Sequence, residues 1–321
     1  MKAKDIKNVS CVGAGVIGYS WALYFSFKNL NVTDYDISEE SLNLAKKRVH
    51  ESLKSLIINE VVTKEESEKI ENNIIYTTSM QEAVQNVEFI VESGPENYDI
   101  KREMVKEMER FTSNNTIIVS STSGLLITEI AKNAEHPERF IGAHPYNPPH
   151  LIPLVEITKG EKTSEEVVNT AKEFYMSIGK EPVVLQKEAL GFICNRLQMA
   201  LYREVCDLVS RGVCTIEDAD KAVTFGPGIR WGIMGPSLVF ELGGGEHGIS
   251  GLLHHLNPSI NMWLNDMADF KQFPSEFGAI AQKGVNEEIS KRPKEIGNDN
   301  KSLEEYRDKM LIELLKLHHK L

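Results

Sequence analysis

The sequence is poor in the features that mark membrane proteins and nucleic-acid binders. No apolar run approaches the roughly 18 residues of a membrane span. Positive charge is scarce, because 36 Lys and Arg stand against 47 Asp and Glu, which gives a net charge of -11. Such a balance disfavours a large phosphate-neutralising surface for nucleic acid or anionic lipid. We therefore expect a small-molecule partner, no nucleic acid and no membrane.

Cysteine and targeting signals are scarce as well. The four cysteines are Cys11, Cys194, Cys206 and Cys214. Their spacing fits neither a disulfide framework nor a zinc ligand set, so we expect reduced, mostly buried thiols. The first residues lead into a strand pattern without an apolar signal region, which predicts a cytoplasmic protein. No metal site is expected, because ligand-type spacing is missing around the remaining histidines His247, His254, His255, His318 and His319.

The length and the apolar pattern predict two domains. A chain of 321 residues exceeds one average domain of ~100 to 200 residues. Strand patterns alternate with helix patterns in the first half, as in a parallel sheet with crossover helices. The expected strands are 8–12, 31–35, 74–76, 87–92, 116–120, 140–143, 154–158 and 182–185. The expected helices between them are 18–28, 39–57, 64–71, 100–111 and 165–178.

The pattern changes after Lys187, where strand signals stop. Helical spacing of apolar residues predicts helices at 192–209, 216–223, 277–292 and 303–317, with connections at 243–251 and 294–300. We predict a Rossmann-type, mostly parallel α/β domain over 1–187 and an all-helical domain over 188–321, which would serve substrate binding and dimerisation.

A glycine-rich turn predicts a dinucleotide site. G-x-G-x-x-G follows the first strand and opens a helix. The first glycine permits the turn, the second lets the backbone approach a pyrophosphate, and the third lets helix and strand pack closely. The phosphates would lie at the helix N-terminus, where free N–H groups favour negative charge. The cofactor-binding residues expected here are Gly13, Gly15, Val16, Ile17 and Gly18.

An acidic residue after the second strand predicts which cofactor is bound. Asp36 lies about 20 residues beyond the glycine turn, where a carboxylate binds the ribose hydroxyls of NAD and repels the phosphate of NADP. Asp34 is a nearby alternative, but it lies farther from the carboxyl edge of the sheet. The sequence therefore favours NAD bound by Asp36.

Five further motifs carry a family resemblance. They are VESGPEN at 91–97, SSTSGL at 120–125, GAHPYNP at 142–148, LVEI at 154–157 and GFICNR at 191–196. In this order and spacing they resemble the 3-hydroxyacyl-CoA dehydrogenase superfamily over nearly the whole chain. The resemblance implies NAD-dependent oxidation of a 3-hydroxyl group, and a homodimer through the helical domain. Candidates for burial in that domain are Met199, Leu201 and Phe240.

Two stretches look closest to one branch of the superfamily, that of L-carnitine 3-dehydrogenase and of lambda-crystallin, an L-gulonate 3-dehydrogenase. These are GPGIRW at 226–231 and SLEEYRD at 302–308. The SSTSGLL, HPYNP and GGEHG motifs look more like the carnitine enzymes, whereas Pro148 with Pro149 looks more like lambda-crystallin.

The chemistry requires a base that takes the hydroxyl proton while the nicotinamide accepts hydride. We expect His144 to be this base, because imidazole ordinarily titrates near neutral pH and the residue ends a strand. Glu156 would orient the ring and stabilise the imidazolium. By resemblance, Ser123 and Asn195 would bind the substrate oxygen. The resemblance also places Glu96, Lys101, Ser123 and Asn147 around the nicotinamide half of the cofactor.

The substrate is the most open question at this level. Acyl-CoA members hold CoA partly through a Ser and a Lys; Ser52 matches the first, but Asn59 falls where the Lys is expected. Arg230 offers a fork that suits a free carboxylate, and Trp231 could face a quaternary ammonium group. We expect a short L-3-hydroxy acid such as carnitine. L-gulonate, a 3-hydroxyacyl-CoA such as 3-hydroxybutyryl-CoA, and a crystallin-like structural role that retains NAD binding stay open as alternatives.

Overall fold

The computed structural model describes residues 1–321, which form two compact units. The first unit contains Met1–Arg196 and Asp308–Leu321, and the second contains Leu197–Arg307. The sequence analysis divides the chain after Lys187 instead. The start of helix α8 (Cys194–Ser210) stays with the first unit because the N–H groups of Ile193 and Cys194 donate to Glu156 of the sheet, each over 2.9 Å.

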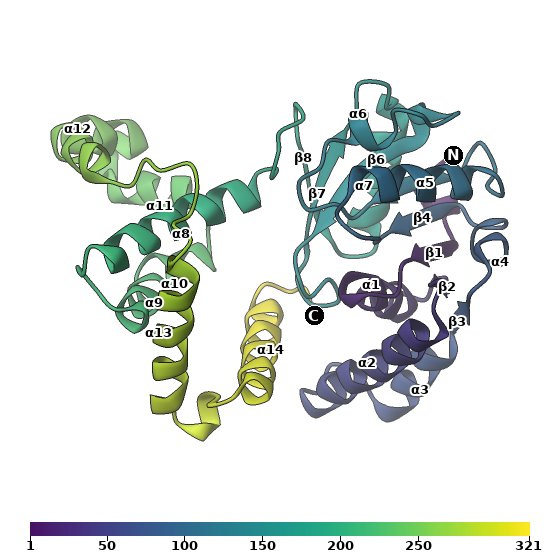
Figure 1. The fold of residues 1–321 in the computed structure, drawn as a ribbon, viewed down its shortest axis with the longest axis horizontal. Helices are drawn as coiled ribbons and strands as arrows, with labels where there is room; N and C mark the ends of the chain where they lie inside the picture. The colour runs from purple at the N-terminus through teal and green to yellow at the C-terminus, as the bar shows by residue number, and fades with distance from the viewer. The chain divides into compact units, whose positions relative to one another are not determined.

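The first unit is built on an eight-stranded sheet (Figure 1) in the order β3-β2-β1-β4-β5-β6-β7-β8. All neighbouring pairs are parallel except β6 and β7. The strands are β1 (Asn8–Val12), β2 (Asn31–Tyr35), β3 (Ile74–Thr77), β4 (Phe89–Glu92), β5 (Ile117–Ser120), β6 (Phe140–Pro145), β7 (Leu154–Lys159) and β8 (Glu181–Val184). Each predicted strand is present, and the mostly parallel Rossmann-type class is confirmed.

Helices cover both faces of this sheet. They are α1 (Val16–Phe27), α2 (Glu39–Ile58), α3 (Lys64–Asn72), α4 (Met80–Val84), α5 (Tyr98–Glu109), α6 (Ile127–Ile130) and α7 (Glu165–Ser177). Side chains alternate across the strands, so Val91 packs in one core with α1, α2 and α7, while Ile90 packs in the other with α4, α5 and α6. The short helices α4 and α6 were not predicted, because four or five residues carry no helical period.

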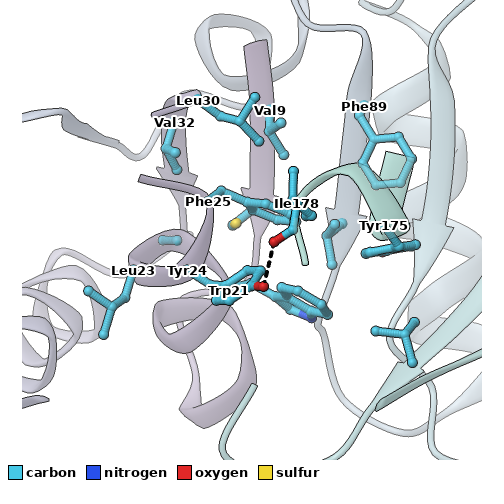
Figure 2. Packing of buried hydrophobic residues seen from close by; sticks show 14 of the residues in the cluster. Val9, Trp21, Leu23, Tyr24, Phe25, Leu30, Val32, Phe89, Tyr175 and Ile178 are labelled. Atoms are coloured by element: carbon cyan, nitrogen blue, oxygen red, sulfur yellow. Dashed lines mark hydrogen bonds between the residues drawn. The ribbon is translucent and has the colours of Figure 1, made fainter. Parts of the chain in front are cut away.

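Aromatic packing fixes α1 against α7 (Figure 2). The ring of Trp21 stacks on that of Phe25, with centroids 5.0 Å apart, and lies 5.7 Å from that of Tyr175. Tyr24 donates its hydroxyl hydrogen to the carbonyl oxygen of Ile178 over 2.7 Å. Buried aromatic pairs of this kind stabilise a fold by more than the burial of their apolar area alone. The helix that begins at the glycine turn is therefore anchored along its length.

The second unit is helical throughout. It contains the rest of α8, then α9 (Ile216–Phe225), α10 (Pro227–Trp231), α11 (Pro236–Gly243), α12 (Gly248–Asp266), α13 (Phe277–Lys291) and the first part of α14 (Asn300–Leu317). Its small buried cluster consists of Cys206, Ile216 and Phe277. Residues 308–321 return to the first unit, where Ile312 and Leu315 join the main core.

Both predicted connections are shorter than expected. The connection predicted at 243–251 is limited to Gly244 and the 3-10 turn Gly245–His247, because α12 begins at Gly248 and continues through Pro258. The sequence pattern did not predict this helix, because it contains glycines and a proline, and both residue types disfavour helix interiors. The connection predicted at 294–300 is shortened, since it holds a 3-10 turn at Lys294–Ile296 and α14 begins at Asn300. No helix in residues 1–321 combines the length and the apolar character needed to cross a membrane.

Candidate active site

The glycine turn joins β1 to α1 and has the shape that a dinucleotide needs. Gly13 has φ of 105°, and a Cβ there would lie 2.9 Å from the carbonyl oxygen of Ser93. A Cβ on Gly18 would lie 1.7 Å from the carbonyl oxygen of Gly13. A Cβ on Gly15, the N-cap of α1, would meet no atom within 4 Å. That open space, beside Val16 and Ile17 at the helix N-terminus, fits a pyrophosphate.

Two aspartates of β2 and its following turn have different surroundings. Asp36 accepts hydrogen bonds from the N–H groups of Ala14 and Ser38, over 3.0 and 3.1 Å, and stays partly exposed at the carboxyl end of the strand. Asp34 is completely buried, and neither of its carboxyl oxygens has a hydrogen-bond partner. Burial, and secondly the charge of Asp36, raises the pKa of Asp34 to about 8. Only Asp36 is therefore accessible to a ribose.

A buried ion pair lies where β4 ends. The Nζ atom of Lys101 donates to both carboxylate oxygens of Glu92, over 2.8 and 3.0 Å, and to the carbonyl oxygen of Gly94 over 3.1 Å. Both side chains are 1% exposed. Glu96 lies 3.9 Å from the same Nζ atom and is 44% exposed. Glu92 was not predicted as a site residue, because it ends an apolar strand and its charge partner, Lys101, belongs to another element, α5.

His144 and Glu156 form a dyad across the one antiparallel pair of the sheet. They are direct partners in the register of β6 and β7, and Nδ1 of His144 lies 2.8 Å from Oε2 of Glu156. His144 is 6% exposed and Glu156 is completely buried. With Nδ1 engaged, Nε2 is the ring nitrogen left for a substrate hydroxyl.

The surroundings of Glu156 keep it ionised. Burial is the strongest influence on its carboxyl group and opposes ionisation. Hydrogen bonds from His144 and from the N–H groups of Cys194 and Ile193 act in the opposite direction and prevail, so the pKa of Glu156 lies below its usual value. The start of α8 thus directs its free N–H groups at the carboxylate that orients the imidazole.

Ser123 and Asn195 lie close together. The Nδ2 group of Asn195 donates to the carbonyl oxygen of Ser123 over 2.8 Å, and the hydroxyl of Tyr146 donates to Oδ1 of Asn195 over 3.5 Å. The Tyr146 ring lies 5.5 Å from that of His144, and burial raises the pKa of Tyr146 to about 12. Tyr146 was not predicted, although its place between His144 and Asn147 in one motif was a usable signal.

The loop after β6 is held by residues that the sequence analysis did not single out. Asn147 itself is exposed. The N–H group of His150 donates to Oγ of Ser20 on α1 over 2.9 Å. The buried Nζ atom of Lys180 donates to the carbonyl oxygens of Pro149 and, over 2.9 Å, of Ile152. The loop that carries Asn147 is therefore fixed to the helix that follows the glycine turn.

The remaining predicted residues belong to α10 of the second unit and to α2 of the first. Arg230 and Trp231 are exposed residues of α10 in the second unit. Ser52 lies on α2, and Asn59 ends that helix, where its carbonyl oxygen accepts a hydrogen bond from Nζ of Lys316 over 3.1 Å. All four cysteines are free, and no cluster of three or more His, Cys, Asp or Glu is arranged to hold a metal.

Comparison with known proteins gives consistent matches. The family model described as 3-hydroxyacyl-CoA dehydrogenase, NAD binding domain, matches residues 8–189, and that of the C-terminal domain matches 191–283. The L-carnitine dehydrogenase of Oceanobacillus iheyensis is 39% identical over 260 residues, which are 80% of this chain and 82% of that protein. A 3-hydroxyacyl-CoA dehydrogenase of Gibberella moniliformis is 34% identical over 321 residues, 99% and 97% of the two chains.

A solved structure is similar over nearly the whole chain. It is that of 5-formyl-3-hydroxy-2-methylpyridine 4-carboxylic acid 5-dehydrogenase, which is described as an NAD⁺-dependent dismutase. Its TM-score is 0.79 at 26% identity, over 98% of this chain and 97% of that one.

Proposed function

This chain belongs to the 3-hydroxyacyl-CoA dehydrogenase family and is an NAD-dependent dehydrogenase, and on that premise we propose that it oxidises the C3 hydroxyl of a short, free L-3-hydroxy acid. L-carnitine is the best candidate substrate. The observation that carries the proposal is the contact of 2.8 Å between His144 and the buried Glu156 at the carboxyl end of β6.

In the proposed mechanism, His144 is the catalytic base. Its Nε2 atom takes the hydroxyl proton, and Glu156 stabilises the imidazolium that forms. Asn195 and Ser123 lie together in the first unit and would bind the alcohol oxygen as charge develops on it. Bound NAD⁺ supplies the hydride acceptor, and its pyrophosphate would lie on the N-terminus of α1 with a ribose at Asp36. Glu96, Lys101 and Asn147 would form the surroundings of the nicotinamide half.

The choice of a free acid rests on the second unit and on the relatives. Arg230 would bind the substrate carboxylate through its planar fork, and Trp231 would face the quaternary ammonium group of carnitine. The L-carnitine dehydrogenase of Oceanobacillus iheyensis, with 39% identity, supports this choice. L-gulonate ranks behind carnitine, because it offers no cation for Trp231.

Steady-state kinetics with NAD⁺ tests the proposal. We expect kcat/KM for L-carnitine to exceed that for L-gulonate and for 3-hydroxybutyryl-CoA. His144→Gln should lower kcat by at least about a hundredfold, the usual scale of a lost general base, while NAD⁺ binding stays. Equal or faster turnover of the thioester would refute the free-acid assignment. Full activity of His144→Gln would refute the assignment of the base. A wild-type protein that binds NAD but oxidises none of these substrates would favour the structural, crystallin-like role.

A 3-hydroxyacyl-CoA is the third candidate substrate, after L-gulonate. It is favoured by Ser52 and by the Gibberella moniliformis relative with that name, at 34% identity. Asn59 argues against it, because an amide stands at the position in the sequence where the Lys is expected. Arg230→Met separates the two: it should raise KM for carnitine and leave turnover of the thioester unchanged.

We further propose a cytoplasmic homodimer that forms through residues 188–321, the domain predicted for substrate binding and dimerisation. The second unit exposes large apolar side chains that a second copy would cover. Among them, Met199, Leu201 and Phe240 are 44%, 38% and 42% exposed. Sedimentation equilibrium should give twice the chain mass, and Phe240→Asp should give monomers. A monomeric wild-type protein at micromolar concentration would refute the dimer.

A further inference from the structure

Glu92 lies at the topological switch point of the sheet, where the strand order reverses. The strand order places β1 between β2 and β4, and Val12, Glu92 and Ser120 are partners across the ends of β1, β4 and β5. In such sheets a dinucleotide crosses the carboxyl edge at this point. If Asp36 after β2 binds the adenosine half, the nicotinamide half would lie over β4 and β5. The end of β4 would then lie beneath the part of the cofactor that changes charge.

The carboxylate of Glu92 is fully occupied by donors from three segments. It accepts hydrogen bonds from the N–H group of Gly94 and the hydroxyl of Ser120, each over 2.6 Å, besides those from Lys101. Space around it is tight, because a Cβ on Gly94 would lie 3.0 Å from Oε1 of Glu92 and 2.4 Å from Sδ of Met104. Glu92 therefore fixes the loop after β4, the end of β5 and the start of α5 relative to one another.

Glu96 is the charged group of this cluster that faces solvent. Its Oε1 atom accepts hydrogen bonds from the hydroxyl of Thr122 over 2.6 Å and from the N–H group of Ser123 over 2.8 Å. Its Oε2 atom lies 3.9 Å from Nζ of Lys101, beyond hydrogen-bond distance. Lys101 therefore bonds to Glu92 and makes a longer ion pair with Glu96, so one ammonium group is shared by two carboxylates.

We propose that Glu92 is a positioning residue that sets the preference of the site for the oxidised cofactor. Because Glu92 and Glu96 share the one ammonium group of Lys101, the three side chains together present one net negative charge. The nicotinamide ring is cationic in NAD⁺ and neutral in NADH, so this charge favours NAD⁺. The inference also assigns Lys101, which the sequence analysis placed at the cofactor, to a buried role that acts through Glu92 and Glu96.

The ratio of the two dissociation constants, Kd(NADH)/Kd(NAD⁺), tests the proposal without turnover. Glu92→Gln leaves Glu96 as the only carboxylate beside Lys101, so the cluster becomes neutral and the ratio should fall about fivefold, the scale of one half-exposed charge pair. Glu96→Gln should lower it in the same direction. In the double variant Glu92→Gln/Lys101→Met, Glu96 again carries the only charge, so the ratio should return to the wild-type value.

A matched control separates charge from folding. Glu109 and Arg139 form a second buried pair, 3.4 Å apart, at the other end of α5. Glu109→Gln breaks a pair of the same kind and should lower the melting temperature without changing the ratio. The proposal is overturned if Glu92→Gln weakens both cofactor forms by the same factor, or if the double variant regains stability but not the ratio.

The inference rests on the proposed function only for the course of NAD over this edge. If the wild-type protein binds neither form of the cofactor, the proposed function fails. If it binds both and Glu92→Gln leaves their ratio unchanged, this inference alone fails.

Discussion

Replacement of Asp34 by Asn should make the protein more stable at alkaline pH. In the folded chain both carboxyl oxygens lack partners, and burial raises the pKa from 3.8 to about 8. An unfolded aspartate titrates near ~3.9. Between these values the folded state holds a proton that the unfolded state has lost. Stability from this group is therefore fully present below pH ~4, falls as the pH rises, and is lost above pH ~8.

The size of the effect follows from the shift. One pKa unit corresponds to ~1.4 kcal/mol, so a shift of about four units sets an upper limit near ~6 kcal/mol. Water penetration and local relaxation reduce the cost of a buried charge, so about 2 kcal/mol between pH 5.5 and pH 8.5 is a reasonable expectation for Asp34. At a few degrees per kcal/mol, that corresponds to about 5 °C in melting temperature.

Thermal unfolding followed by circular dichroism at these two pH values measures the difference. Between these two pH values the melting temperature of Asp34→Asn should rise by about 5 °C relative to that of the wild type, because the amide has a similar size and does not titrate. Asp36→Asn is the comparison variant: it should lose NAD⁺ affinity, and it should flatten the pH dependence of stability less than Asp34→Asn does, because the charge of Asp36 is the smaller of the two causes of the raised pKa of Asp34. Parallel melting curves for Asp34→Asn and the wild type across the range would refute the reasoning.

Two further predictions concern the active site. Glu156→Gln should lower kcat by about 10² to 10⁴-fold, because the amide cannot balance the imidazolium, while Kd for NAD⁺ changes less than twofold; stopped-flow kinetics with calorimetry measures both, and a kcat within threefold of the wild type would contradict this role. Gly18→Ala should abolish NAD⁺ binding or folding, since the added Cβ would lie 1.7 Å from the carbonyl oxygen of Gly13. Cofactor titration with a circular dichroism spectrum distinguishes these outcomes, and unchanged affinity in a folded variant would refute the close packing.

The sheet could be predicted because its strands are short apolar runs separated by turn residues, and the register then brings His144 opposite Glu156. The glycine turn could also be predicted, because its three glycines lie within six consecutive residues directly after a strand. Helix α12 could not be predicted, because Gly248, Gly251 and Pro258 lower its intrinsic propensity. Its apolar residues are also largely exposed, so no single buried stripe marks it.

Part of the candidate site could not be predicted from local sequence patterns. Glu92 and Lys101 are nine positions apart in sequence and belong to different elements, so their pairing needs the fold. The same holds for Ser20 and His150, which join α1 to the loop after β6. A carboxylate that ends a wholly apolar strand, as in Phe89–Glu92, was the one available signal.

The most direct test of the central claim is a crystal structure of the protein with NADH and a slowly reacting 3-hydroxy acid. The account predicts that Nε2 of His144 lies ~2.6–3.2 Å from the C3 hydroxyl oxygen while C3 faces the nicotinamide ring. A hydroxyl group bound by another side chain, with His144 turned away from it, would contradict the account.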